Sequence, residues 1–378
     1  MNFLNICDRG PRFRLASLLL ASAALVSACG GGGGGSDTIA PPDAPTASFQ
    51  PLGMPASHVT SDAVAISAGG LVVAGTAKDA SGRDQAFRWT VGAGFTTLGF
   101  LPGGSRSAAA DMSADGSVIV GGGDVRATPS QVAFRWSSAG GMQALPTLPQ
   151  MISLCVSTAV SGDGQVVVGT CLGAGNSGFR WTEATGAVSL GRFGGGMSAS
   201  STASAISDDG QVIGGAGNPI LRGAMLWPHG QEPLTLGHLA AGDNFASVSA
   251  LSADGRVAAG VSIGSESGVR MYRWTVESGM TAIPGTPADV TEMNVRALSA
   301  DGSVLVGSWT RGGVESAVIW DAARGLRPLV QALAEERRLS LPGWTLQRAN
   351  AVTPDGRVIA GTGLNPQGMT EAWIVRLN

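Results

Sequence analysis

The chain has 378 residues, enough for two average domains or for one large all-β domain. It is rich in glycine and low in charge, with 24 basic against 27 acidic residues. Binding to phosphate backbones requires a clustered basic surface, so this balance gives no electrostatic reason to expect a nucleic-acid partner.

The first 28 residues have the pattern of an export signal. Arg9, Arg12 and Arg14 precede the apolar run Leu15–Val26, which is too short to span a membrane. The run ends in LVSAC, which looks like a bacterial lipobox, in which Cys29 becomes the lipidated N-terminus. The alternative is an ordinary signal sequence followed by an unmodified cysteine.

Residues 29–47 are predicted to form a flexible tether. Gly30–Gly35 and the Pro/Ala-rich run after them offer no means of burying a core. Glycine directly after the cysteine resembles lipoproteins that are sent on to the outer membrane. We therefore expect a protein held in the bacterial envelope by its N-terminal lipid, on either the periplasmic or the cell-surface face.

From residue 48 onward the sequence repeats about every 46 residues. One motif has the form ALSADGSVLVG, and its turn position falls at Gly69, Asp115, Asp163, Asp209, Asp254, Asp301 and Asp355. A second motif reads AFRW, and a third resembles LGFLPG. Each unit therefore holds about four short apolar segments separated by turn residues, which is typical of β-strands.

Seven units of four strands predict an all-β fold, a seven-bladed β-propeller over residues 48–378. The last unit ends near Leu377 without its fourth segment, whereas Phe49–Met54 resembles that segment. We expect the N-terminal strand to complete the last blade and close the ring, which removes free sheet edges. An amphipathic helix is expected only near Pro328–Arg338. A stacked β-helix would use far shorter repeats.

The repeated aspartate has a structural and a functional interpretation. In the stretch around Asp301 the spacing fits a type I turn followed by glycine in the left-handed region. A calcium loop would need several oxygen ligands from alternating positions, but apolar strand follows directly, and Gly69 replaces the aspartate once. We predict structural turns, no metal site and no cofactor.

The AFRW motif is expected to pack its aromatic residues between neighbouring sheets. The intervening arginine points to the opposite face in four units, at Arg88, Arg135, Arg180 and Arg273. These side chains either line a groove for an anionic ligand or have a structural or solvent-facing role. Leu226 and Ile319 at the same position favour the second interpretation.

Cys155 and Cys171 lie opposite each other across a hairpin that turns at Asp163. In an oxidising compartment such a pair is able to form a cross-strand disulfide if the strand geometry allows it. We predict that disulfide. The alternative is two buried free thiols.

The repeat unit as a whole resembles the HAF-type extracellular repeat of bacterial secreted and surface proteins, over essentially all of residues 48–378. The histidine that gives the repeat its name is absent, since Gln85, Val132 and Ser177 stand in its place. The last unit, with its Pro-Asp-Gly turn at Asp355, also resembles TolB-like periplasmic propellers. Both resemblances imply an exported propeller, and the HAF-type resemblance implies no catalytic residue.

Signals for catalysis are weak. His58, His229 and His238 lack metal-ligand spacing. The sequence GVSIG at 260–264 matches the G-x-S-x-G pattern, but no helix follows it as a nucleophile elbow requires. Tyr272, the only tyrosine, stands at a core-like position of the repeat.

We therefore predict an envelope-anchored binding or interaction module, monomeric and without enzymatic activity, that takes a protein or glycan ligand through its loops. The alternatives are a propeller enzyme acting on carbohydrate and a passive structural surface protein. Paired buried carboxylates in the central channel would favour the enzyme, whereas a lining of serine, glycine and alanine would favour binding.

Overall fold

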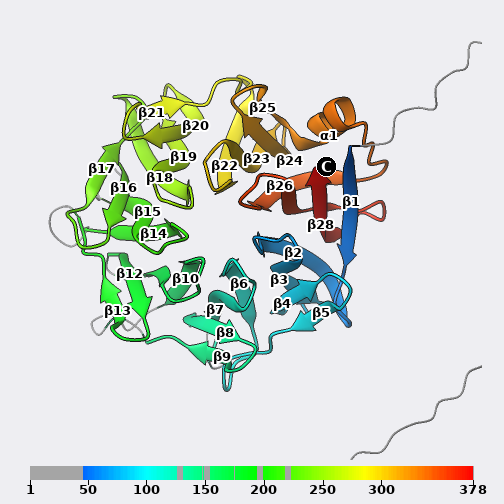
Figure 1. The fold of residues 1–378 in the computed structure, drawn as a ribbon, viewed down its shortest axis with the longest axis horizontal. Helices are drawn as coiled ribbons and strands as arrows, with labels where there is room; N and C mark the ends of the chain where they lie inside the picture. Colours follow the sequence, from blue (N-terminus) through cyan, green and yellow to red (C-terminus); the bar gives the residue numbers. More distant parts are fainter. Residues whose placement is uncertain are drawn as a thin grey trace, which may run out of the picture. The chain divides into compact units, whose positions relative to one another are not determined.

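A computed structural model describes residues 46–125, 131–146, 148, 154–173, 175–193, 199–217 and 223–377. Cys29, the export signal and all but the last two residues of the tether lie outside the described residues. Ala44–Asn378 is one compact unit. It consists of seven four-stranded antiparallel sheets that form blades around a central axis (Figure 1). The predicted seven-bladed β-propeller is therefore confirmed.

Blades one to six each use four consecutive strands. Blades one to three comprise β2 (His58–Ile66), β3 (Val72–Asp79), β4 (Asp84–Thr90), β5 (Gly94–Thr97); β6 (Ser107–Met112), β7 (Val118–Gly123), β8 (Val132–Ser137), β9 (Gly141–Ala144); and β10 (Cys155–Val160), β11 (Val167–Cys171), β12 (Ser177–Thr182), β13 (Gly186–Ser189). Blades four to six comprise β14 (Ser201–Ile206), β15 (Val212–Gly217), β16 (Gly223–Pro228), β17 (Leu234–Gly237); β18 (Asp243–Leu251), β19 (Val257–Gly264), β20 (Gly268–Thr275), β21 (Gly279–Ala282); and β22 (Val290–Leu298), β23 (Val304–Arg311), β24 (Val314–Asp321), β25 (Gly325–Pro328). The first strand of each blade lies nearest the axis (Figure 1).

Blade seven joins the two ends of the domain. Its sheet order is β1-β28-β27-β26, comprising β1 (Ala47–Gly53), β26 (Thr345–Val352), β27 (Val358–Leu364) and β28 (Thr370–Leu377). Ala47 lies opposite Leu377, and Phe49 lies opposite Val375. The N-terminal strand therefore closes the ring as the repeat count predicts.

The repeated S-x-D-G sequence forms the turn between the first and second strands of a blade. The Asp301 carboxylate accepts hydrogen bonds from the Ser299 hydroxyl at 2.7 Å and from the Ser303 amide at 2.9 Å. The Ser299 hydroxyl oxygen accepts the Val304 amide at 3.0 Å, and Gly302 has a φ of +66°. The same serine or threonine and aspartate pairing recurs at the other turns, with Asp115, Asp163, Asp209, Asp254 and Asp355.

The core lies between neighbouring blades. The aromatic residue of the second motif is buried there, as Phe87, Phe134, Phe179, Tyr272 and Trp373. These rings remove large apolar areas from water and hold each sheet against the next.

The arginine of the same motif links neighbouring blades. In four blades an arginine donates a hydrogen bond to the carbonyl of the turn glycine in the next blade: Arg88 to Gly116, Arg135 to Gly164, Arg273 to Gly302 and Arg376 to Gly70. In blade seven the donor stands two positions later along the strand. Three of the four motif arginines therefore have a structural partner, and Arg376 makes the same contact from blade seven.

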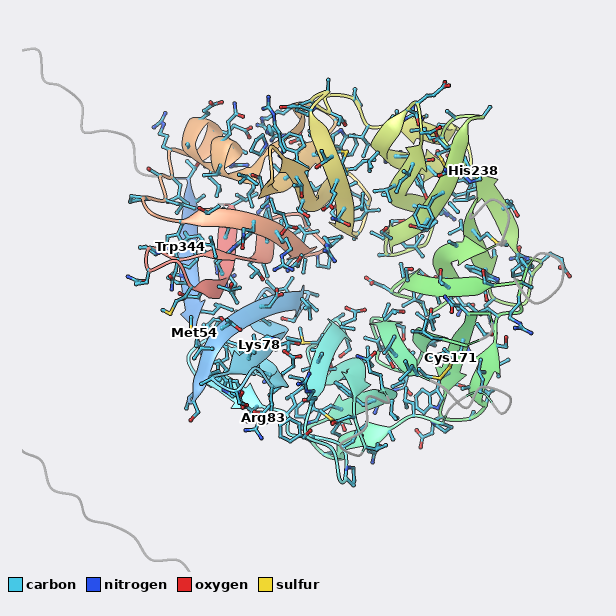
Figure 2. All side chains as sticks on the ribbon, turned by 180° about the vertical axis from the view of Figure 1, so that it is seen from behind. Met54, Lys78, Arg83, Cys171, His238 and Trp344 are labelled. Carbon is cyan, nitrogen blue, oxygen red and sulfur yellow. A yellow bond between two sulfur atoms is a disulfide. The ribbon has the colours of Figure 1, made fainter. Side chains whose placement is uncertain are left out.

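A disulfide joins Cys155 of β10 to Cys171 of β11, and the two residues are direct partners in the strand register. Both side chains are buried, and the bond lies inside blade three (Figure 2).

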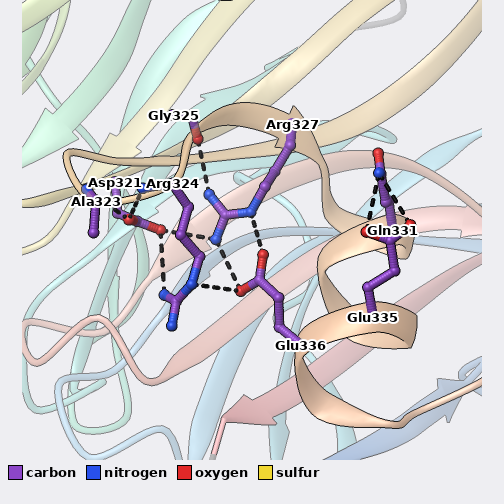
Figure 3. Close-up of polar contacts among 8 residues, drawn as sticks. All are labelled: Asp321, Ala323, Arg324, Gly325, Arg327, Gln331, Glu335 and Glu336. Carbon is purple, nitrogen blue, oxygen red and sulfur yellow. Dashed lines mark hydrogen bonds and ion pairs between the residues drawn. The ribbon is translucent and has the colours of Figure 1, made fainter.

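The only helix within the described residues is α1 (Leu329–Arg337), which follows β25 where the sequence predicts a helix. It buries Leu329 and Leu333 against blades six and seven. Arg327 of β25 binds Asp321 of β24, at 2.8 Å, and Glu336 in the last turn of the helix, so it links the helix to blade six (Figure 3). Of the residues described, no helix has the length and apolar character needed to cross a membrane.

Candidate functional site

Every inner strand carries a β-bulge at the same place in the repeat. A bulge inserts one unpaired residue and changes the direction of its side chain. The bulged residues are Val64, Ala110, Thr158, Ser204, Ser249, Arg296 and Asn350, and all seven line one central cavity of about 230 Å³. The bulges therefore determine which side chains face the axis.

The last glycine of the repeated motif is what permits this bulge. A Cβ atom on Gly307 would lie 2.0 Å from the Asn294 carbonyl oxygen of the inner strand, and one on Gly260 would lie 1.8 Å from that of Ser247. Only glycine allows so close an approach of two backbones. The glycine therefore allows the bulge, and the bulge in turn directs its extra residue towards the channel.

The bulged residues are small or weakly polar in blades one to five, whereas blades six and seven place Arg296 and Asn350 there. Arg296 has neither a hydrogen bond nor an ion pair within the part of the chain that the structure describes, and it is exposed to the channel. Enclosure by the surrounding protein lowers the pKa of the Arg296 guanidinium, and the positive charge of Arg348 lowers it further, while the negative charges of Glu315 and Asp62 partly oppose this shift. The channel therefore holds a cation whose hydrogen-bond donors are available to a ligand.

The neighbouring charges are already engaged with one another. Arg348 lies 3.6 Å from both Asp62 and Glu315. Asp62 also accepts hydrogen bonds from Thr362 and, at 3.3 Å, from the Asn350 amide. These contacts join blades six, seven and one beside Arg296.

A ring of backbone hydrogen bonds surrounds the axis where the inner strands end. Ala68 donates to Ala114, and the series continues from blade to blade through Gly162, Asp208, Ala253, Ala300 and Pro354, with N···O distances between 2.7 and 3.0 Å. Proline has no N–H, so the seventh bond, from Pro354 back to blade one, is chemically impossible. Six bonds therefore fix this end of the channel, and the ring is interrupted between blades seven and one.

Two aspartates also line the channel. Asp111 occupies a position where every other repeat has alanine, and its carboxylate accepts the amides of Val160 at 2.9 Å and Met112 at 2.8 Å. Burial raises the pKa of Asp111 to about 7 in spite of these bonds. Burial, together with the charge of Asp209, also raises the pKa of Asp208. The channel lining therefore includes two carboxyl groups with raised pKa values, and the charge of Asp208 adds to the shift of Asp111.

The residues singled out in the sequence lie elsewhere. The six turn aspartates serve their own turns, and none of them lines the channel. Ser262 of the G-x-S-x-G match is buried inside β19 and donates to Asp243 at 2.6 Å. The described residues contain no group of three or more histidine, cysteine, aspartate or glutamate side chains placed to hold a metal.

The channel residues Arg296, Asn350 and Asp111 escaped the sequence reasoning. For Asp111 a signal was present in the sequence, because the other units have alanine at its position. The facing direction of the bulged position, however, depends on the pairing of β-strands.

No protein-family model matches the chain, and no curated protein matches it. Among solved structures, the chain is similar to an oligogalacturonate lyase from Vibrio parahaemolyticus, with a TM-score of 0.55, 12% identity and coverage of 88% of this chain and 97% of that one. It is also similar to the β-propeller domain of the Trilobed protease from Pyrococcus furiosus, with a TM-score of 0.55, 10% identity and coverage of 84% and 95%.

A further likeness, to TolB from Acinetobacter baumannii, has a TM-score of 0.48 and 15% identity, and it covers 68% of this chain and 63% of that one. At these identities the similarities concern the fold alone. The strand topology shows a seven-bladed β-propeller, and the likeness to the propeller domain from Pyrococcus furiosus agrees with this fold.

Proposed function

We propose that this protein is an exported, envelope-anchored binding module whose central channel receives a protein or glycan ligand carrying an anionic group. The observation that carries the proposal is Arg296, an arginine placed on a bulge in the channel with no acceptor among the described residues. A guanidinium in a confined, partly desolvated site binds carboxylates and similar anions more strongly than one in open water. The export signal and the HAF-type resemblance support the location.

A ligand screen tests the binding function. The domain from Ser48 onward is applied to a glycan array and used to capture envelope components, alongside Arg296→Ala and the control Arg83→Ala. Arg83 is an exposed arginine on the outer side of blade one, away from the axis (Figure 2). We expect Arg296→Ala to weaken binding by about tenfold or more and Arg83→Ala to leave it unchanged. Failure of the unsubstituted domain to bind anything would instead favour a passive structural protein.

The anchor has its own test. Cys29→Ala is expected to release the protein from membranes, because lipidation requires the cysteine thiol. Retention of the variant in the membrane fraction would contradict the lipobox assignment.

An enzyme acting on carbohydrate is the second candidate, and the raised pKa values of Asp111 and Asp208 in the same channel favour it. Both oxygens of Asp111 already accept backbone amides, which favours a structural role for this carboxylate. Incubation with acidic and neutral oligosaccharides, followed by product analysis, separates the two functions. Turnover that is lost in both Asp111→Asn and Asp208→Asn would establish the enzyme and displace the binding proposal.

A further inference from the structure

A second cavity lies away from the channel, between blades three and four. It has a volume of about 390 Å³, and its lining includes Arg180, Gln211, Trp227 and His229. No residue of the central channel contributes to it. This cavity is referred to below as the blade 3–4 pocket.

Arg180 is the exception among the arginines of the repeated motif. Its counterparts Arg88, Arg135 and Arg273 donate to the turn glycine of the following blade. Arg180 makes no such bond to Gly210, and its buried Nε atom has no hydrogen-bond acceptor within the described part of the chain. Burial lowers the pKa of its guanidinium. A buried donor of this kind destabilises the protein unless something accepts its hydrogen bond.

Trp227 supplies a second unsatisfied donor at the same pocket. Its side chain is 6% exposed, and the buried indole Nε1 atom has no partner among the residues that the structure describes. The lining residues include no aspartate or glutamate that could accept from either group. Two N–H donors, one of them cationic, therefore belong to the lining of one cavity and have no acceptor among the described residues.

The remaining walls show what kind of molecule would bring that acceptor. Val188, Leu190, Ile213, Pro228 and Pro233 form an apolar surface beside the two donors. Ligand sites commonly combine such a surface with a few placed polar groups that orient the ligand. The planar guanidinium matches the two oxygens of a carboxylate, and the apolar wall matches an uncharged body attached to it.

We propose that the blade 3–4 pocket binds a small organic carboxylate whose body is an apolar ring. The carboxylate accepts from Arg180 and Trp227, and the ring packs on the apolar wall. This site is separate from the central channel, so it stands or falls independently of the ligand proposed there.

The test titrates the full-length protein with benzoate, and with benzamide and inorganic phosphate as comparison probes. Binding is followed by calorimetry and by the NMR signal of the Trp227 indole N–H, which Trp227→Phe identifies. We expect benzoate to shift that signal, and benzamide and phosphate to bind at least about tenfold more weakly. Arg180→Ala is expected to reduce benzoate affinity by about tenfold or more.

Arg135→Ala is the matched control, since Arg135 holds the same place in blade two and has an acceptor in Gly164. It should lower the melting temperature and leave benzoate affinity unchanged, whereas Arg180→Ala should leave the melting temperature unchanged or raise it. The proposal is overturned by benzoate binding that survives Arg180→Ala, by equal binding of benzamide or phosphate, or by no binding of benzoate at millimolar concentrations.

Discussion

Asp111 stands at a position where the other six repeats have Ala65, Ala159, Ala205, Ala250, Ala297 and Ala351. The carboxylate bonds to an amide in its own blade and to one in the next, so it links blades two and three. A partly buried carboxylate without a cationic partner is costly when ionised, and this cost is what raises its pKa.

This raised pKa makes a prediction about stability and pH. The pKa of Asp111 is about 7 in the folded state and near the ordinary aspartate value in the unfolded chain, so the folded state binds the proton more tightly. Its contribution is therefore present below about pH 4 and is lost as the pH rises towards and beyond 7. Asp111→Asn, which keeps one acceptor, should be more stable than the natural protein by about 1–3 kcal/mol at pH 8.

Urea unfolding of both proteins between pH 4 and pH 8 measures this difference. The two free energies should converge towards pH 4 and separate as the pH rises. A constant difference across this range would show that Asp111 does not titrate as described.

At the scale of the element, the S-x-D-G hairpin shows which of its repeated residues the fold needs most. Ser299 is buried, and its hydroxyl links the turn aspartate to the first amide of the next strand. Where Gly69 replaces the aspartate, Ser67 still accepts the Val72 amide at 3.0 Å. The hydroxyl residue, serine or in blade seven Thr353, is therefore the constant part of the hairpin, and the aspartate supports it from the surface.

We expect Ser299→Ala to cost about 1–2 kcal/mol of stability, because it leaves the Val304 amide without its acceptor. Asp301→Ala should cost less, about 0.5–1 kcal/mol, since the carboxylate is exposed and water replaces it. Denaturant unfolding of the two variants at pH 7 ranks them. A larger loss in Asp301→Ala would contradict this assignment of roles.

The Asp301 contribution also has a direction with pH. Hydrogen bonds from Ser299 and the Ser303 amide lower the pKa of Asp301 to about 2. The stabilisation is present above about pH 4 and is lost as the pH falls towards 2. The difference between Asp301→Ala and the natural protein should therefore shrink in acid.

At the scale of the whole molecule, the ring depends on a strand that comes from the other end of the chain. Phe49 of β1 packs edge-on against Trp344, with ring centroids 4.9 Å apart, and lies 6.3 Å from Trp373. This contact and the β1–β28 pairing close the propeller and cover an edge that would otherwise be open to aggregation.

Phe49→Ala should therefore lower the free energy of unfolding by about 1.5–3 kcal/mol. This loss is smaller than that for a fully buried phenylalanine, because Phe49 is only partly buried. The exposed neighbour Ser48 provides the control, and Ser48→Ala should change stability by less than about 0.5 kcal/mol. Thermal and urea unfolding measure both variants. Equal, small effects would show that β1 adds little to ring closure.

The sequence by itself was sufficient for the number of blades, the closure by the N-terminal strand and the single helix. The blade number follows from local chemistry, because Asp-Gly turns and alternating apolar residues recur at a fixed step. The closure follows because the last repeat lacks its fourth strand and an extra strand of the same kind precedes the first repeat. The opposed positions of Cys155 and Cys171 also follow from counting along one hairpin, and the structure places a disulfide there.

Only the tertiary structure decided where ligands have room to bind. The bulge that directs Arg296 towards the axis arises from pairing between strands, and the repeat alone does not say which face its extra residue takes. Arg180 and Arg135 hold the same place in their repeats, yet Arg135 has an acceptor in the next blade and the Nε atom of Arg180 has none among the described residues. Whether a buried donor finds an acceptor depends on how neighbouring blades pack against each other. The repeat determines where each strand lies along the chain, but it does not determine these contacts between blades.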